Sequence, residues 1–192
     1  MSHANDTATR PSLSFEFFPP KDDAGINRLM SGTVSRLSAF GPEYFSVTSG
    51  AGGSTREGTQ ALVEKLVRSG ANAVPHLSAG GSTDAEVARL VEHYRNLGIQ
   101  RILCLRGDKP SVGNQHTVFA RDLVEQLRQR FPGQFELSVA AYPETHPDSA
   151  SAEEDMRYFA AKVHAGASSA ITQYFYSPDA YEYFVKRCDK AG

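Results

Sequence analysis

Apolar stretches typical of buried β-strands alternate with amphipathic helical stretches along the chain, and this alternation constrains the fold more than any other feature. Expected strands cover residues 13–18, 44–48, 73–77, 101–105, 135–141 and 169–175. Expected helices follow them over residues 22–40, 57–69, 83–97, 117–130, 151–165 and 178–190. Because a helix follows every strand, the order predicts an α/β protein whose parallel strands are joined by right-handed crossovers.

Two architectures satisfy this order, an open doubly wound sheet and a (β/α)₈ barrel. Polar or charged residues recur at the carboxyl ends of the expected strands: Glu16, Thr48, His76, Arg106 with Asp108, Tyr142 and Gln173. In a closed barrel all strand ends surround one mouth, whereas an open sheet concentrates its site at one switch point. The pattern therefore favours a (β/α)₈ TIM barrel.

The chain length accommodates the first six strand–helix units of such a barrel. At roughly 31 residues per unit of a ~250-residue barrel, the sequence ends at Gly192, where a seventh strand is expected. We therefore expect a disordered N-terminal tail over residues 1–11 and an incomplete TIM-barrel domain over residues 12–192. The chain is then either a truncated product or a fragment of a longer one.

Composition excludes several classes of protein. The formal net charge is -2, with 40% hydrophobic and 22% charged residues, which argues against both disorder and nucleic-acid binding. The N-terminus lacks the apolar stretch of a signal peptide, and no apolar run approaches membrane-spanning length, so we expect a cytoplasmic protein. Cys104 and Cys188 lack metal-ligand spacing, no metal site is expected, and Cys104 is expected to be buried.

Glu16 lies between aromatic residues near the end of the first expected strand. In a strand, Phe15 and Phe17 share one face and Glu16 lies on the other. A carboxyl group among aromatic rings is costly to ionise, so its pKa is expected above that of a free glutamate. Such a group suits general acid catalysis near neutral pH. A surface strand carrying one solvated glutamate is the alternative.

The other strand ends carry weaker signals. Arg106 and Asp108 flank Gly107, which allows a close backbone approach, and the alternative is a turn held by an ion pair. Tyr142 and His146 place an aromatic ring and an imidazole after the fifth expected strand. The segment therefore suits a site as well as a structural turn.

Three further segments complete the pattern. The glycine-rich loop 50–55 lacks the spacing of known nucleotide-phosphate loops, which favours a flexible connector. Residues 82–86 resemble a capping box with Ser82 or Thr83 as the N-cap. The amide of Gln173 suits hydrogen bonding to the edge of a heterocycle, although a partly exposed strand residue is as plausible.

Taken together, six segments in this order resemble those of the methylenetetrahydrofolate reductase family. The resemblance covers the chain after about the first ten residues and rests on residues 14–21, 46–48 with the glycine loop, 75–77, 105–108, 141–147 and 170–175. It implies a (β/α)₈ barrel that binds FAD at the carboxyl ends of its strands. The implied reaction reduces 5,10-methylenetetrahydrofolate to 5-methyltetrahydrofolate, with NADH or NADPH as electron donor in a ping-pong cycle.

The resemblance also implies roles for individual residues. Glu16 would be the general acid that assists protonation of the substrate at N10, Asp108 would tune charge near the flavin and the pterin, and Gln173 would bind the substrate. The implied FAD-binding residues are Thr48, His76, Arg106, Gly107, Asp108, Tyr142, His146, Asp155 and Lys162. The implied partners are folate and nicotinamide, and a homo-oligomer is expected.

Two residues depart from the family pattern, since Ser49 and Phe119 stand where tyrosine is usual. Two alternatives to the reductase stay open. One is a non-catalytic remnant of the barrel that binds FAD or serves in oligomerisation. The other is a different flavin barrel of the proline-dehydrogenase type, which Glu16 and Gln173 in their motifs disfavour.

Overall fold

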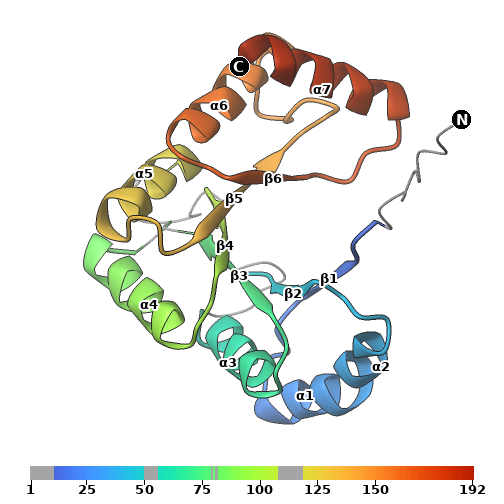
Figure 1. Cartoon of the computed structure of the whole chain (residues 1–192), viewed down its shortest axis with the longest axis vertical. Coiled ribbons are helices and arrows are strands. Elements are labelled where there is room, and N and C mark those ends of the chain that lie inside the picture. The colour runs from blue at the N-terminus through green and yellow to red at the C-terminus, as the bar shows by residue number, and fades with distance from the viewer. Residues whose placement is uncertain (1–10, 50–55, 79, 81, 108–118) are drawn as a thin grey trace, which may run out of the picture.

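Six parallel strands form one curved sheet in the computed structural model, which describes residues 11–49, 56–78, 80, 82–107 and 119–192. The strands are β1 (Ser14–Phe17), β2 (Tyr44–Val47), β3 (Ala73–Ser78), β4 (Arg101–Leu105), β5 (Glu136–Ala141) and β6 (Ser169–Thr172). Each strand pairs in parallel with the strand that follows it in the chain. The sheet curls with the helices on its outer side (Figure 1), which confirms part of a (β/α) barrel.

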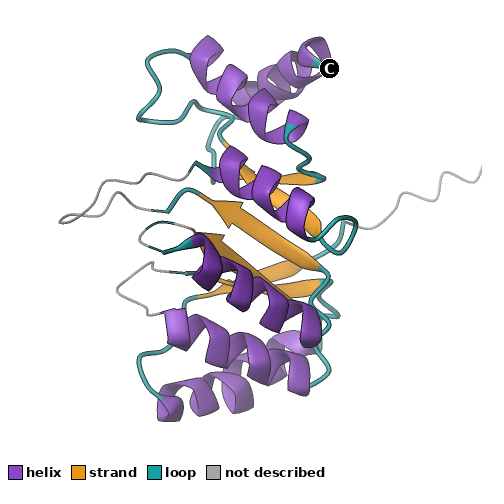
Figure 2. Cartoon of the chain, turned by 90° about the vertical axis from the view of Figure 1, so that its left-hand side faces the viewer, coloured by secondary structure: helices purple, strands orange, loops and turns teal. Residues whose placement is uncertain are grey.

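Helices occupy the stretches between the strands. They are α1 (Asp23–Arg28), η1 (Leu29–Val34), α2 (Ser35–Ser38), α3 (Arg56–Arg68), α4 (Asp84–Asn96), α5 (Ala120–Arg130), α6 (Ala152–His164) and α7 (Pro178–Ala191). Figure 2 shows them packed along the sheet. No helix in the described ranges combines the length and apolar character that a membrane crossing needs.

Two expected elements differ from the structure. The helix expected over residues 22–40 changes its hydrogen bonding in the middle, where η1 is a π-helix. Apolar spacing does not distinguish a π-turn from an α-turn over so few residues. The last expected strand, 169–175, ends at Thr172. Its partner β5 ends at Ala141, and the chain after β5 turns away at Pro143. Residues 174 and 175 therefore have no partner strand.

The core lies between the outer face of the sheet and helices α3, α4 and α5. Fully buried side chains include Leu62 and Leu66 of α3, Tyr94 of α4 and Leu127 of α5. Leu62 and Leu66 are four residues apart and so lie on one apolar stripe of α3. Among the described residues, α6 and α7 contain no buried residue. The core is therefore concentrated around β2 to β5.

Local sequence explains how two of these elements begin and pack. Thr83 is the N-cap of α4 and forms a capping box with Glu86, which confirms the second of the two expected caps. Phe15 and Phe17 of β1 both stack on Phe45, with ring centroids 6.1 and 5.4 Å apart. Since these rings face the core, the intervening Glu16 faces the opposite side of the sheet.

Candidate functional site

Glu16 and His76 meet on the inner side of the sheet, near the carboxyl ends of β1 and β3. Nε2 of His76 lies 3.3 Å from Oε2 of Glu16, and the imidazole is buried while the carboxylate is 51% exposed. The alignment is too poor for a complete hydrogen bond, so the buried Nε2 has no hydrogen-bond partner among the described residues. The two side chains therefore approach each other across β2.

This contact corrects the expected pKa of Glu16. The sequence predicts a raised pKa, but the structure lowers the pKa of Glu16 below its usual value. The largest cause is the interaction of the carboxylate with His76, which outweighs the opposing effect of desolvation. Glu16 is consequently an ionised carboxylate at neutral pH in this structure.

A second buried polar atom lies at the same end of the sheet. Thr48 follows β2 directly, and its Oγ1 is buried without a hydrogen-bond partner among the described residues. Buried polar atoms are almost always hydrogen-bonded in native proteins, so an unsatisfied pair marks a place where another molecule could supply the partner. Thr48 and His76 together meet that condition.

Gly107 is fixed in place by the end of β3. Its φ is +77°, and a Cβ atom at this position would lie 2.0 Å from Oγ of Ser78. That hydroxyl donates a hydrogen bond of 3.0 Å to the carbonyl of Arg106. Only glycine suits both the backbone angle and this approach. Asp108 and the glycine-rich loop 50–55 lie outside the described residues.

Arg106 connects the end of β4 to the loop that follows β5. Its Nη2 lies 3.1 Å from Oδ2 of Asp148, which makes an ion pair rather than a free cation at the mouth. The Arg106 side chain is about one-third exposed, at 31%. It therefore remains accessible to an anionic group that approaches the mouth.

The loop after β5 is organised by Asp155 of α6. The carboxylate accepts a hydrogen bond of 3.1 Å from the backbone N–H of His146 and one of 3.3 Å from the hydroxyl of Ser149. The rings of Tyr142 and His146 lie edge to face, 4.5 Å apart. The contacts thus bring together three of the predicted site residues, Tyr142 and His146 from the loop and Asp155 from α6.

Lys162 reaches the sheet from the last turn of α6. Its Nζ donates a hydrogen bond of 2.6 Å to the carbonyl of Ala140 and lies 5.5 Å from the centre of the Phe159 ring. Burial lowers the pKa of Lys162, while the charge of Asp155 acts in the opposite direction.

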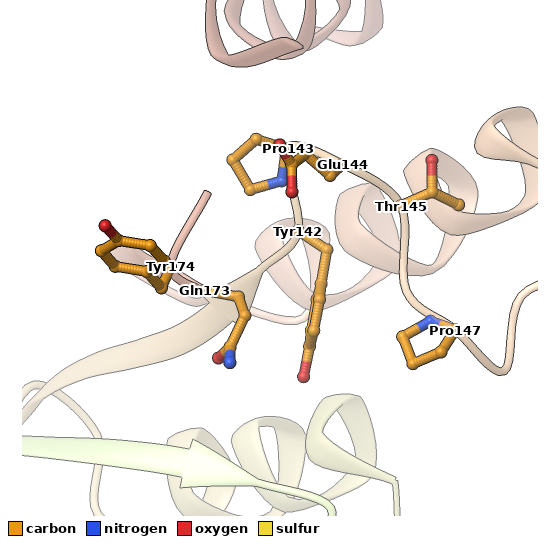
Figure 3. A pocket seen from close by; sticks show the side chains of 7 residues that line it. All are labelled: Tyr142, Pro143, Glu144, Thr145, Pro147, Gln173 and Tyr174. Carbon is orange, nitrogen blue, oxygen red and sulfur yellow. The ribbon is translucent and has the colours of Figure 1, made fainter. Parts of the chain in front are cut away.

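Gln173 borders a pocket of about 370 Å³ at the ends of β5 and β6 (Figure 3). Residues that line it are Tyr142, Pro143, Glu144, Thr145, Pro147, Gln173 and Tyr174. Figure 3 shows the side chains of Gln173 and Tyr142 extending in the same direction. The amide is therefore available to a ligand on that side of the pocket.

Glu144 joins the site although no role for it was predicted from the sequence. Its Oε1 accepts backbone hydrogen bonds of 3.1 Å from Tyr176 and 3.0 Å from Ser177. The signal in the sequence was an acidic residue after one strand together with a helix start, Ser177-Pro178, after the next strand.

The described residues contain no cluster that could hold a metal ion.

Consecutive parallel strands with helices outside place the chain in the class of (β/α) barrels, of which it forms a part. Solved structures support this class. A Mycobacterium tuberculosis tryptophan synthase matches with a TM-score of 0.61 and 14% identity, over 95% of this chain and 72% of that chain. A 2,3-dimethylmalate lyase matches with a TM-score of 0.61 and 16% identity, over 92% of this chain and 63% of that chain. At such identities the likeness concerns the fold alone.

Sequence comparisons identify the family. The family model described as methylenetetrahydrofolate reductase matches residues 1–192. The 5,10-methylenetetrahydrofolate reductase of Escherichia coli is 38% identical over 182 residues, covering 94% of this chain and 60% of that protein. That of Buchnera aphidicola from Acyrthosiphon pisum is 42% identical over 178 residues, covering 92% and 60%. The chain belongs to the methylenetetrahydrofolate reductase family, and it spans about 60% of the length of these relatives.

Proposed function

We propose that the chain takes part in the FAD-dependent reduction of 5,10-methylenetetrahydrofolate to 5-methyltetrahydrofolate with NADH or NADPH. The proposal includes the ping-pong cycle, a cytoplasmic location and a homo-oligomer. One observation carries it. In a chain of this family, the buried polar atoms of Thr48 and His76 lack hydrogen-bond partners among the described residues, beside Glu16 at the strand ends.

The residues at the mouth fit a flavin dinucleotide. Thr48 and His76 offer buried polar atoms for a heterocycle, and Arg106 offers a partly exposed guanidinium for a pyrophosphate. Gly107 allows close backbone approach. Tyr142 and His146 lie in the loop after β5, and Asp155 and Lys162 lie on α6. Asp108, which belongs to the proposed set, lies outside the described residues. When bound, FAD supplies the hydride chemistry, and the chain supplies orientation and charge.

Glu16 is proposed to deliver the proton that opens the substrate ring at N10. Because Glu16 is ionised in this structure, the role requires the pKa to rise when ligands cover the half-exposed carboxylate. Desolvation already acts to raise the pKa of Glu16, and removing the remaining water around the carboxylate strengthens this effect. Gln173 is proposed to hold the substrate through its amide at the pocket.

An anaerobic absorbance experiment on the purified chain tests the proposal. We expect flavin bands that bleach with NADH and return when methylenetetrahydrofolate is added. Glu16→Gln is expected to bleach normally but to regain its bands at least about a hundredfold more slowly, since general acid catalysis contributes about that much. A chain that takes up no added FAD would contradict the proposal and favour the non-catalytic remnant.

A further inference from the structure

Glu144 joins two loops of the candidate site that are far apart in the sequence. It lies in the loop after β5, and its Oε1 accepts hydrogen bonds from the backbone N–H groups of Tyr176 and Ser177, at 3.1 and 3.0 Å. These two N–H groups directly precede α7, where Ser177 is the N-cap. One carboxylate oxygen therefore ties the β5 loop to the start of α7.

The charge of Glu144 suits this position. A helix N-terminus carries partial positive charge, so a carboxylate there is stabilised beyond an ordinary hydrogen-bond acceptor. Ser177 uses its own side chain on Ala180 N, at 3.2 Å, and so does not compete for Glu144. The carboxylate and the N-cap hydroxyl thus satisfy different N–H groups.

The segment from Gln173 to Ser177 is consequently fixed at both ends. At its start, Gln173 N donates a hydrogen bond of 2.7 Å to the carbonyl of Ala141. At its end, Glu144 holds Tyr176 and Ser177. No strand pairs with the residues between them in the described structure, because β6 ends at Thr172. The two anchors therefore set where Gln173 and Tyr174 face the pocket (Figure 3).

Backbone strain beside Glu144 points to the same conclusion. Thr145 has a φ of +73°, an angle that a β-branched residue adopts only at an energetic cost. A turn closed by the hydrogen bond from Thr145 N to the carbonyl of Tyr142, at 3.2 Å, holds this conformation. Such strain persists where surrounding contacts fix the backbone. The turn that presents Glu144 is fixed in this way.

We propose that Glu144 is a positioning residue that orders the segment from Gln173 to Ser177 and thereby sets the affinity of the pocket for the pterin substrate. The ordering stands on the hydrogen bonds alone. The effect on affinity rests on the proposed function, because it assumes that Gln173 binds that substrate.

Amide hydrogen exchange, resolved by NMR on the whole chain, tests the ordering without any need for activity. In Glu144→Ala, we expect the amides of Tyr176 and Ser177 to exchange at least about tenfold faster, because each loses a charge-assisted hydrogen bond. Glu144→Gln retains an acceptor oxygen and should restore most of the protection. Glu182→Ala, which removes an exposed carboxylate of α7, should leave both amides unchanged. Unchanged exchange in Glu144→Ala would overturn the proposal.

Steady-state kinetics test the effect on affinity. We expect Glu144→Ala to raise KM for methylenetetrahydrofolate by about tenfold. This is the affinity lost when the displaced Gln173 no longer makes its hydrogen bond to the substrate. The rate at which NADH reduces the flavin should not change, and Glu144→Gln should recover most of the affinity. Faster exchange with unchanged KM would overturn the link to the pocket. A wild-type chain that never reduces the folate would contradict the proposed function and, with it, this link, while the exchange result would still decide the ordering.

Discussion

At the scale of single residues, Glu16 is governed by an imidazole from a strand that is not its neighbour. His76 lies on β3 and reaches across β2 to within 3.3 Å of the carboxylate. The chain order predicts that both residues stand at strand ends, but not how closely they approach. That distance depends on the curvature of the sheet, and it reverses the expected direction of the pKa shift.

Removal of the imidazole should raise the pKa of Glu16 toward that of an ordinary glutamate. In the wild type the pKa of Glu16 is lower in the folded state than in the unfolded state. Ionised Glu16 therefore stabilises the fold at pH values above its unfolded-state pKa of about 4.3. This stabilisation is lost as the pH falls through the folded-state pKa. In His76→Leu this loss of stability at low pH should disappear. Titration of the Glu16 carboxyl carbon by NMR measures the shift.

The matched control is His93→Leu. His93 also contacts a carboxylate, with Nε2 at 2.9 Å from Oε1 of Glu64, but this pair is remote from β1. It should leave the Glu16 titration unchanged. A Glu16 pKa that does not move in His76→Leu would show that the imidazole is not the cause.

At the scale of elements, Gly107 follows β4 and lies against Ser78 at the end of β3. Alanine at position 107 should destabilise the protein by more than the positive φ alone would. A positive φ costs an L-residue about 1–2 kcal/mol, and at Gly107 a Cβ would also overlap Oγ of Ser78 at 2.0 Å. Gly98 has a similar φ of +80° with nothing within 4 Å of a Cβ, so Gly98→Ala reports the angle alone.

Urea unfolding of both variants compares the two costs. We expect Gly107→Ala to lose at least about 1 kcal/mol more than Gly98→Ala, the lower end for overpacking. Ser78→Gly combined with Gly107→Ala should recover part of the difference. Equal losses in the two alanine variants would mean that the contact with Ser78 relaxes without cost.

Element order and most element positions could be predicted from the sequence, because strand and helix periods differ clearly over five or more residues. The end of β6 could not, since it depends on where its partner β5 stops. The π-turn of η1 likewise escapes apolar spacing. At the site, the strand-end residues were predictable from chain order, whereas the role of Glu144 was not, because its partners lie on the next loop.

At the scale of the whole molecule, burial is distributed unevenly. Helices α3, α4 and α5 carry fully buried side chains, whereas α6 and α7 carry no buried residue within the described structure. Ala170 of β6 is exposed as well, although it lies in the sheet. The molecule therefore has a well-packed part around β2 to β5 and a weakly covered part at β6.

Hydrogen exchange across the chain should follow this distribution. We expect amides in α6 and α7 to open with a smaller free energy than those in α4 and α5, since few apolar contacts hold them. Mass spectrometry of peptides from each helix measures the difference. Protection in α7 equal to that in α4 would contradict the expected order.

The neighbour-to-neighbour pairing of the strands has a consequence for biosynthesis. Every described strand after β1 bonds to the one made just before it, as β4 does to β3 and β5 to β4. A nascent chain that leaves the ribosome can therefore add one strand and one helix at a time, without waiting for a later segment to complete an earlier pair. At each stage of translation, the growing sheet exposes only the free edge of β1 and that of its newest strand.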